Sequence, residues 1–89
     1  EIVASFLESM PNTVEDIKTQ LAQKNWEQLS RVVHKIKPTI TLMGIHHLKD
    51  KIVLLEQESK NGQNENTIQE LAEEVSLFLS RAIKSLREV

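Results

Sequence analysis

One histidine, His34, lies in a helical stretch where its side chain should point into solvent. At about 100° per residue, the apolar residues of this stretch cluster around one direction, and His34 lies about 140° away from it. The residues that define this direction are Leu29, Val33, Ile36, Ile40 and Met43. An exposed imidazole is an accessible nucleophile. A lone exposed histidine usually belongs to an ordinary solvated helix face, so exposure alone favours the interpretation without function.

Positive charge is concentrated around this histidine. Residues 31–51 carry a net charge of +4, whereas residues 1–30 and 52–89 each carry −3. The cations of the central stretch are Arg31, Lys35, Lys37, Lys49 and Lys51. Such a cationic region provides the field needed by a group that bears or meets a phosphoryl. A solvated basic face without chemistry is the alternative interpretation.

Pro38 breaks a local rule next to His34. A proline inside a helix has no N–H and pushes against the carbonyl four residues earlier, which here belongs to His34. We therefore expect a kink or a loosened turn at the histidine. A proline inside a helix next to a candidate site points toward function, because local sequence preferences are most often violated at functional sites. A tolerated proline with no role is the alternative.

The elements that carry these residues are predicted to be helices throughout. The chain has two glycines and two prolines, and residues that favour helices dominate its composition. Apolar residues at spacings of three and four predict helices over residues 2–9, 11–24, 25–43, 45–60 and 67–87, the first ended by Pro11. Asn25 and Asn66 are predicted N-caps, and Gly44 and Gly62 are predicted helix ends.

Short connections between these helices favour antiparallel neighbours. The sequence therefore predicts an all-α fold, an up-down antiparallel four-helix bundle with a short additional N-terminal helix. Its leucines, isoleucines and valines, together with Met43, are expected in the core.

Length and composition limit the possible functions. With 89 residues, the chain should form one domain over residues 1–89, and its start at Glu1 without a methionine suggests a piece of a longer protein. A net charge of −2 gives no overall attraction to nucleic acid or to an anionic membrane. The absence of cysteine excludes disulfides and thiolate chemistry, and the apolar runs are too short to span a membrane.

A metal site is not expected. His46 and His47 are adjacent, so their side chains diverge by about 100° on a helix and cannot easily share one metal. We expect both imidazoles to point outward at the start of the fourth helix, near the surface around His34, with Leu48 inward.

The residues around His34 resemble a known family. The stretch from Val33 to Gly44, VHKIKPTITLMG, is similar to the signature A-H-x-L-K-G-S-x-x-x-x-G of histidine-containing phosphotransfer (HPt) domains. The shared features are the histidine, a lysine three residues later and a glycine ten residues later. The resemblance extends over the chain through Phe6-Leu7, Asn25-Trp26, Leu48, Leu55-Glu56 and the long last helix.

This resemblance implies roles for particular residues. His34 would be the phospho-acceptor, Lys37 the cation facing the phosphoryl oxygens, and Gly44 the helix terminator. Two positions depart from the family pattern, because Pro38 stands where the family usually has glycine and Thr39 where it has a smaller residue. Both departures concern the surface that a partner must approach.

The resemblance also implies the reaction and its partners. The domain would accept a phosphoryl group from the phospho-aspartate of a receiver domain and pass it to another receiver, with Mg²⁺ supplied by the receiver. No Gly-rich phosphate loop is present, so the domain would be a phosphocarrier without its own ATP site. We expect a cytoplasmic monomer that forms a module of a hybrid sensor kinase. The expected docking residues are Glu27, Arg31, Lys35, Lys37, Pro38 and Thr41.

Two other interpretations are open at this stage. A dimerisation and phosphotransfer domain of a histidine kinase also carries histidine and proline on an exposed helix. Its pattern has an acidic residue after the histidine and proline five positions later, whereas Lys35 follows His34 and Pro38 lies four positions later. A helical interaction domain without chemistry is the other alternative, and it predicts that replacing His34 changes no phosphorylation.

Overall fold

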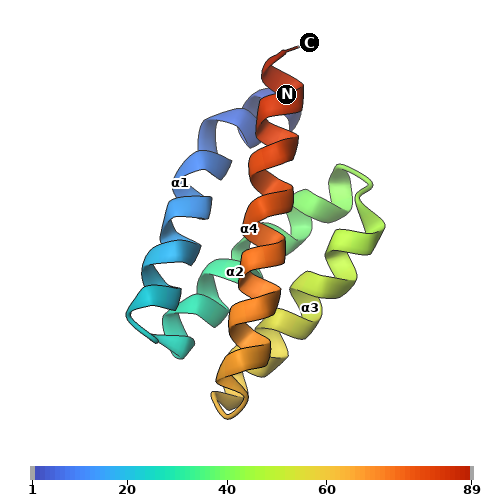
Figure 1. Cartoon of the computed structure of the whole chain (residues 1–89). Coiled ribbons are helices and arrows are strands. Elements are labelled where there is room, and N and C mark those ends of the chain that lie inside the picture. Colours follow the sequence, from blue (N-terminus) through green and yellow to red (C-terminus); the bar gives the residue numbers. More distant parts are fainter. Residues whose placement is uncertain (1, 89) are drawn as a thin grey trace.

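The structure is a computed structural model that describes residues 2–88, with side chains from residue 4 to residue 88. The described chain forms four helices, α1 (Ile2–Ala22), α2 (Trp26–Leu42), α3 (His46–Asn61) and α4 (Glu65–Arg87). The chain runs up and down the bundle, and each helix packs against two others: α1 and α3 each contact both α2 and α4 (Figure 1). The predicted all-α four-helix bundle is confirmed.

The predicted additional N-terminal helix does not exist as a separate element, because α1 continues through Pro11. The residues that hold it together lie on one buried stripe that crosses the proline: Phe6, Met10, Val14 and Ile17. Packing of this stripe offsets the cost of a proline inside a helix, about 3 kcal/mol. The predicted core positions Ile2 and Val3 have side chains outside the described residues, as do Glu1 and Val89 of the predicted domain.

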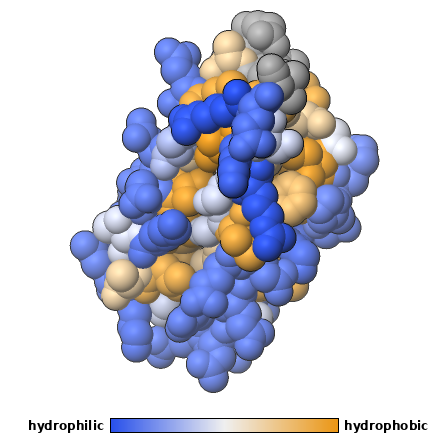
Figure 2. All heavy atoms as spheres, turned by 45° about the horizontal axis from the view of Figure 1, so that its top comes forward, coloured by the Kyte–Doolittle hydropathy of each residue, from blue (hydrophilic) through white to orange (hydrophobic). Residues whose placement is uncertain are grey.

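The core fixes the rotation of each helix. Buried apolar side chains come from all four helices, and full burial of each contributes about 1.5–3 kcal/mol. Three leucines that were expected in the core are instead exposed: Leu42, Leu54 and Leu77. Figure 2 shows one face of the resulting surface, with apolar areas visible between hydrophilic side chains. No described helix combines the length and apolar character required to cross a membrane.

The helix ends follow local chemistry, with one exception. The Asn25 side chain accepts a hydrogen bond from the backbone N–H of Gln28 at 3.3 Å, as predicted for an N-cap. Gly44 and Gly62 have φ of 75° and 66°, the left-handed conformation that favours glycine. The predicted cap at Asn66 was wrong, because the Ile68 N–H already donates to the Asn64 carbonyl and α4 begins at Glu65.

Candidate functional site

Helix α2 presents His34 to solvent. Its neighbours Val33 and Ile36 are buried in the core and fix the rotation of the helix. The His34 side chain is 66% exposed, as the helical geometry predicted. Pro38 lies one turn later and is exposed, and α2 remains helical from Trp26 to Leu42, so the proline does not interrupt the helix.

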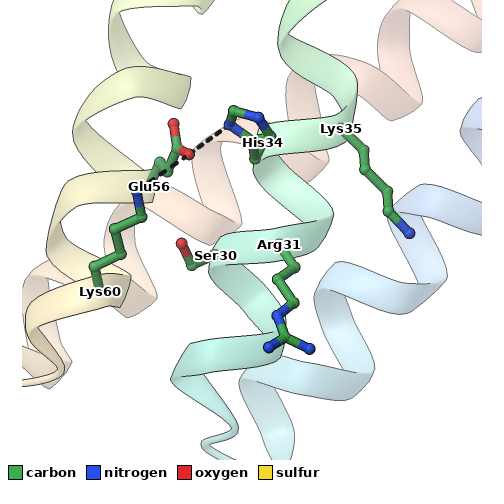
Figure 3. A pocket seen from close by; sticks show the side chains of 6 residues that line it. All are labelled: Ser30, Arg31, His34, Lys35, Glu56 and Lys60. Carbon is green, nitrogen blue, oxygen red and sulfur yellow. Dashed lines mark hydrogen bonds and ion pairs between the residues drawn. The ribbon is translucent and has the colours of Figure 1, made fainter.

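Helix α3 brings a carboxylate, Glu56, to the histidine. The Nδ1 atom of His34 lies 2.7 Å from Oε2 of Glu56, and Figure 3 shows this contact between the two helices. The Lys37 ammonium donates to the other carboxylate oxygen, Oε1, at 2.8 Å. Nζ of Lys60, one turn after Glu56 on α3, lies 3.8 Å from Oε2. Three basic side chains therefore converge on one carboxylate.

The Glu56 carboxylate is ionised although it is buried. Only 6% of the residue is exposed, and burial by itself raises a carboxyl pKa. The hydrogen bond from Lys37 acts more strongly in the opposite direction, and the hydrogen bond with His34 assists it, so the Glu56 pKa falls below its ordinary value of 4.5. Glu56 is consequently negative at neutral pH.

An ionised Glu56 determines which nitrogen of His34 carries the proton. A carboxylate only accepts hydrogen bonds, so the imidazole Nδ1 must be the donor in the 2.7 Å contact. In the neutral ring, the lone pair is then on Nε2. The site therefore holds His34 in the tautomer whose free nitrogen, Nε2, is available as a nucleophile.

An open hollow of about 340 Å³ lies beside the histidine, between α2 and α3. It is lined by Ser30, Arg31, His34, Lys35, Glu56 and Lys60. In Figure 3, Lys60 extends toward Glu56, whereas Arg31 and Lys35 point away from His34. The Arg31 guanidinium instead donates to Glu27, one turn earlier on α2, at 2.9 Å. The predicted cationic region is thus only partly assembled around the histidine.

The remaining predicted site residues have different positions. Thr41 is exposed on α2, and its hydroxyl donates to the Lys37 carbonyl at 3.0 Å. Lys51 pairs with Glu74 of α4 and so is not part of the cationic region. His47 was expected near the surface around His34, but its ring packs edge-on against Phe78 of α4, with ring centroids 4.9 Å apart.

Sequence reasoning assigned no role to Glu56 or to Lys60. A signal for Glu56 was available, because it follows Ile52 by four residues and so belongs to the buried face of its helix. A carboxylate on a buried face requires a cationic partner. Lys60 carries no such signal, since an exposed lysine near a helix end is common.

The described side chains offer no cluster for a metal ion. Among residues 2–88, no three histidine, aspartate or glutamate side chains lie close enough to hold one together. Both oxygens of Glu56 already have basic partners. The carboxylate beside His34 is therefore committed to cationic side chains.

Fold and site together define a class: a four-helix bundle that presents an exposed histidine oriented by a buried carboxylate. The sequence matches the family described as Hpt domain over residues 1–88. The chain therefore belongs to the Hpt domain family, whose members carry out histidine phosphotransfer with receiver domains in phosphorelays. Comparisons with curated proteins and with solved structures give no significant match.

Replacing Lys37 with methionine should destabilise the fold by about 1–2 kcal/mol at pH 7, because the buried Glu56 carboxylate loses its strongest partner. The lowered pKa of Glu56 means that its ionised form stabilises the fold fully above pH 4.5, and that this contribution is lost as the pH falls through the lowered value. In Lys37→Met, the loss of stability on acidification should be smaller than in the wild type. Urea unfolding between pH 7 and pH 3 measures both effects.

The matched control is Lys51→Met, which removes a lysine from a more exposed ion pair with Glu74. Its effect should stay below about 1 kcal/mol. Equal stability losses and equal pH dependence in the two variants would contradict the assignment of Lys37 as the main partner of Glu56.

Proposed function

We propose that this domain is a phosphorelay intermediate that accepts a phosphoryl group on His34 and passes it to a second receiver domain. The observation that carries the proposal is the 2.7 Å contact between Nδ1 of His34 and the ionised Glu56. It leaves Nε2 unprotonated on a side chain that is two-thirds exposed. The membership in the Hpt domain family supports the same reaction.

The transfer of the phosphoryl group to His34 requires no separate base, because Nε2 carries no proton that must be removed. The Nε2 lone pair attacks phosphorus in the acyl phosphate of a receiver aspartate, a nitrogen–phosphorus bond forms, and the phosphorus–oxygen bond to the aspartate breaks. The electron pair of the broken bond leaves with the aspartate carboxylate. The proton stays on Nδ1, so the phosphorylated ring is an imidazolium, and the Glu56 carboxylate stabilises its positive charge.

The receiver supplies what this chain does not. We infer that Mg²⁺ arrives bound to the receiver, because the Glu56 oxygens are committed to His34 and Lys37. The exposed α2 residues around His34 would meet the receiver surface: Glu27, Arg31, Lys35, Pro38 and Thr41. The receiver would belong to a hybrid kinase or to a response regulator, and the domain would act as a monomer in the cytoplasm.

The self-contained bundle favours this function over that of a kinase dimerisation domain. Four helices of one chain enclose the core, and each contacts two others. A two-helix kinase domain requires a second chain to complete its bundle. Sedimentation of the purified domain should therefore give a monomer.

The test of the function is phosphoryl transfer from a panel of Mg²⁺-loaded phospho-receiver domains. The expected result is acid-labile, base-stable label on the domain, and loss of that label to a second receiver. No label from receivers that phosphorylate a known acceptor would favour an interaction domain without chemistry. Label that requires ATP and a kinase ATP-binding domain would favour the kinase dimerisation domain.

A further inference from the structure

We propose that Pro38 keeps the backbone carbonyl of His34 free, and that this oxygen accepts a hydrogen bond from the receiver domain when it docks. The inference rests on the proposed function and goes beyond it, because it assigns a particular contact and a selectivity to the face around the histidine. The preferred receiver carries a neutral N–H or O–H donor at the point that meets this oxygen.

A proline inside a helix leaves one carbonyl without its usual donor. In a regular helix, the N–H of each residue donates to the carbonyl four residues earlier, and proline has no N–H. Pro38 lies inside α2, so the carbonyl that lacks this donor belongs to His34. The side chains of Ile36 and Ile40, on either side of the proline, are buried in the core and keep the helix in place. The helix therefore continues past a carbonyl that it does not satisfy.

The side chain at position 38 does not replace the missing donor. In this protein the hydroxyls of Ser9, Thr13 and Thr41 each donate to the carbonyl four residues earlier in their own helix, at 3.2 Å or less. Position 38 is the place from which such a hydroxyl would reach the His34 carbonyl, and a proline ring has none. The His34 carbonyl therefore needs water or a partner for its hydrogen bond.

This carbonyl lies on the face that a receiver must cover. A helix carbonyl points along the axis toward the residue four positions later, and positions 34 and 38 are only about 40° apart around the helix. The His34 side chain is 66% exposed, and Pro38 is exposed as well. A receiver whose phospho-aspartate reaches Nε2 of His34 displaces water from this turn. An unpaired carbonyl is costly to bury, so docking favours a receiver that supplies a donor.

The charges of this turn favour a neutral donor over a cationic one. Residues 31–38 contain Arg31, Lys35 and Lys37 and no acidic residue. Arg31 and Lys37 are paired with glutamates, whereas Lys35 is exposed directly after the histidine. An ammonium or guanidinium group of the receiver would meet electrostatic repulsion here. A backbone amide or a hydroxyl group meets none.

Two variants test the contact, Pro38→Ala and Pro38→Val, because each returns an N–H to position 38 that can donate to the His34 carbonyl. The receiver used is one that labels the wild type. Both variants should bind it about three- to tenfold more weakly in titrations, the effect of losing one hydrogen bond. The transfer rate at saturating phospho-receiver should not change, because the carbonyl does not touch the phosphoryl group.

Pro11→Ala is the matched control, since it makes the same change inside α1. Both alanine variants should unfold at a higher temperature than the wild type, because proline disfavours a helix. Only Pro38→Ala should bind the receiver more weakly.

Three results would overturn the inference and leave the proposed function standing. They are wild-type affinity in Pro38→Ala, equal weakening in Pro11→Ala, and wild-type affinity in Pro38→Val alone, which would assign the contact to the apolar surface of the ring. A slower saturated transfer at unchanged affinity would also overturn it. A wild type that no competent receiver labels would refute the proposed function itself.

Discussion

Replacing His34 with glutamine should abolish phosphoryl acceptance completely while leaving the fold intact. Glutamine has no nucleophilic ring nitrogen, so no nitrogen–phosphorus bond can replace the one proposed at Nε2. The side chain is 66% exposed, but it donates a hydrogen bond to the buried Glu56, which keeps the stronger hydrogen bond from Lys37, so the free energy of unfolding should fall by about 1 kcal/mol at most. Transfer of label from a competent phospho-receiver, together with thermal unfolding, measures both expectations.

The matched controls are the two other histidines. His46 and His47 lie in the first turn of α3, and the His47 ring packs against Phe78 of α4. His46→Gln and His47→Gln should accept label like the wild type. Full labelling of His34→Gln, or loss of label in either control at unchanged stability, would show that the acceptor lies elsewhere.

Replacing Glu56 with glutamine should slow phosphoryl transfer on the order of tenfold, or about 1.4 kcal/mol in activation free energy. Glutamine keeps the shape but has no charge, so the imidazolium formed during transfer loses its stabilising partner. Its amide can also donate to Nδ1, and the ring is then free to carry its proton on Nε2, where no lone pair remains for attack. Single-turnover transfer under saturating receiver measures the rate.

The control for Glu56 is Glu58→Gln on the same helix. Glu58 accepts a hydrogen bond from the Asn64 side chain at 3.2 Å, whereas His34 pairs with Glu56. The Glu58→Gln variant should accept the phosphoryl group at the wild-type rate. If Glu56→Gln also transfers at that rate, while nitrogen NMR shows an unchanged imidazole tautomer, the orienting role of Glu56 is refuted.

Much of the fold was predictable because its signals are local and repeat along the helices. Apolar spacing placed Val33 and Ile36 inward and His34 outward, and the structure agrees. The sequence wrongly predicted a helix break at Pro11, because a proline is a strong local signal for one. The buried residues from Phe6 to Ile17 keep α1 continuous by packing against the other helices, and this packing is not a local signal.

Only the part of the site that lies on one helix could be predicted, because contacts between helices leave no local signal in the sequence. His34 and Lys37 lie on one helix, so their spacing is readable from the sequence. Glu56 lies 22 residues away from His34 and reaches it only because α2 packs beside α3. Family resemblance implied Lys37 as the cation facing the phosphoryl, and the structure adds that the Lys37 ammonium already binds Glu56.

The position of the phosphoryl group on the ring tests the proposed mechanism most directly. Nitrogen–phosphorus coupling in the ¹⁵N-labelled, phosphorylated domain should place phosphorus on Nε2 of His34 and a proton on Nδ1. That result follows from the Nδ1 contact with an ionised Glu56. Phosphorus on Nδ1, or on any other residue, would contradict it, because a phosphoryl group on Nδ1 cannot coexist with the hydrogen bond to Glu56.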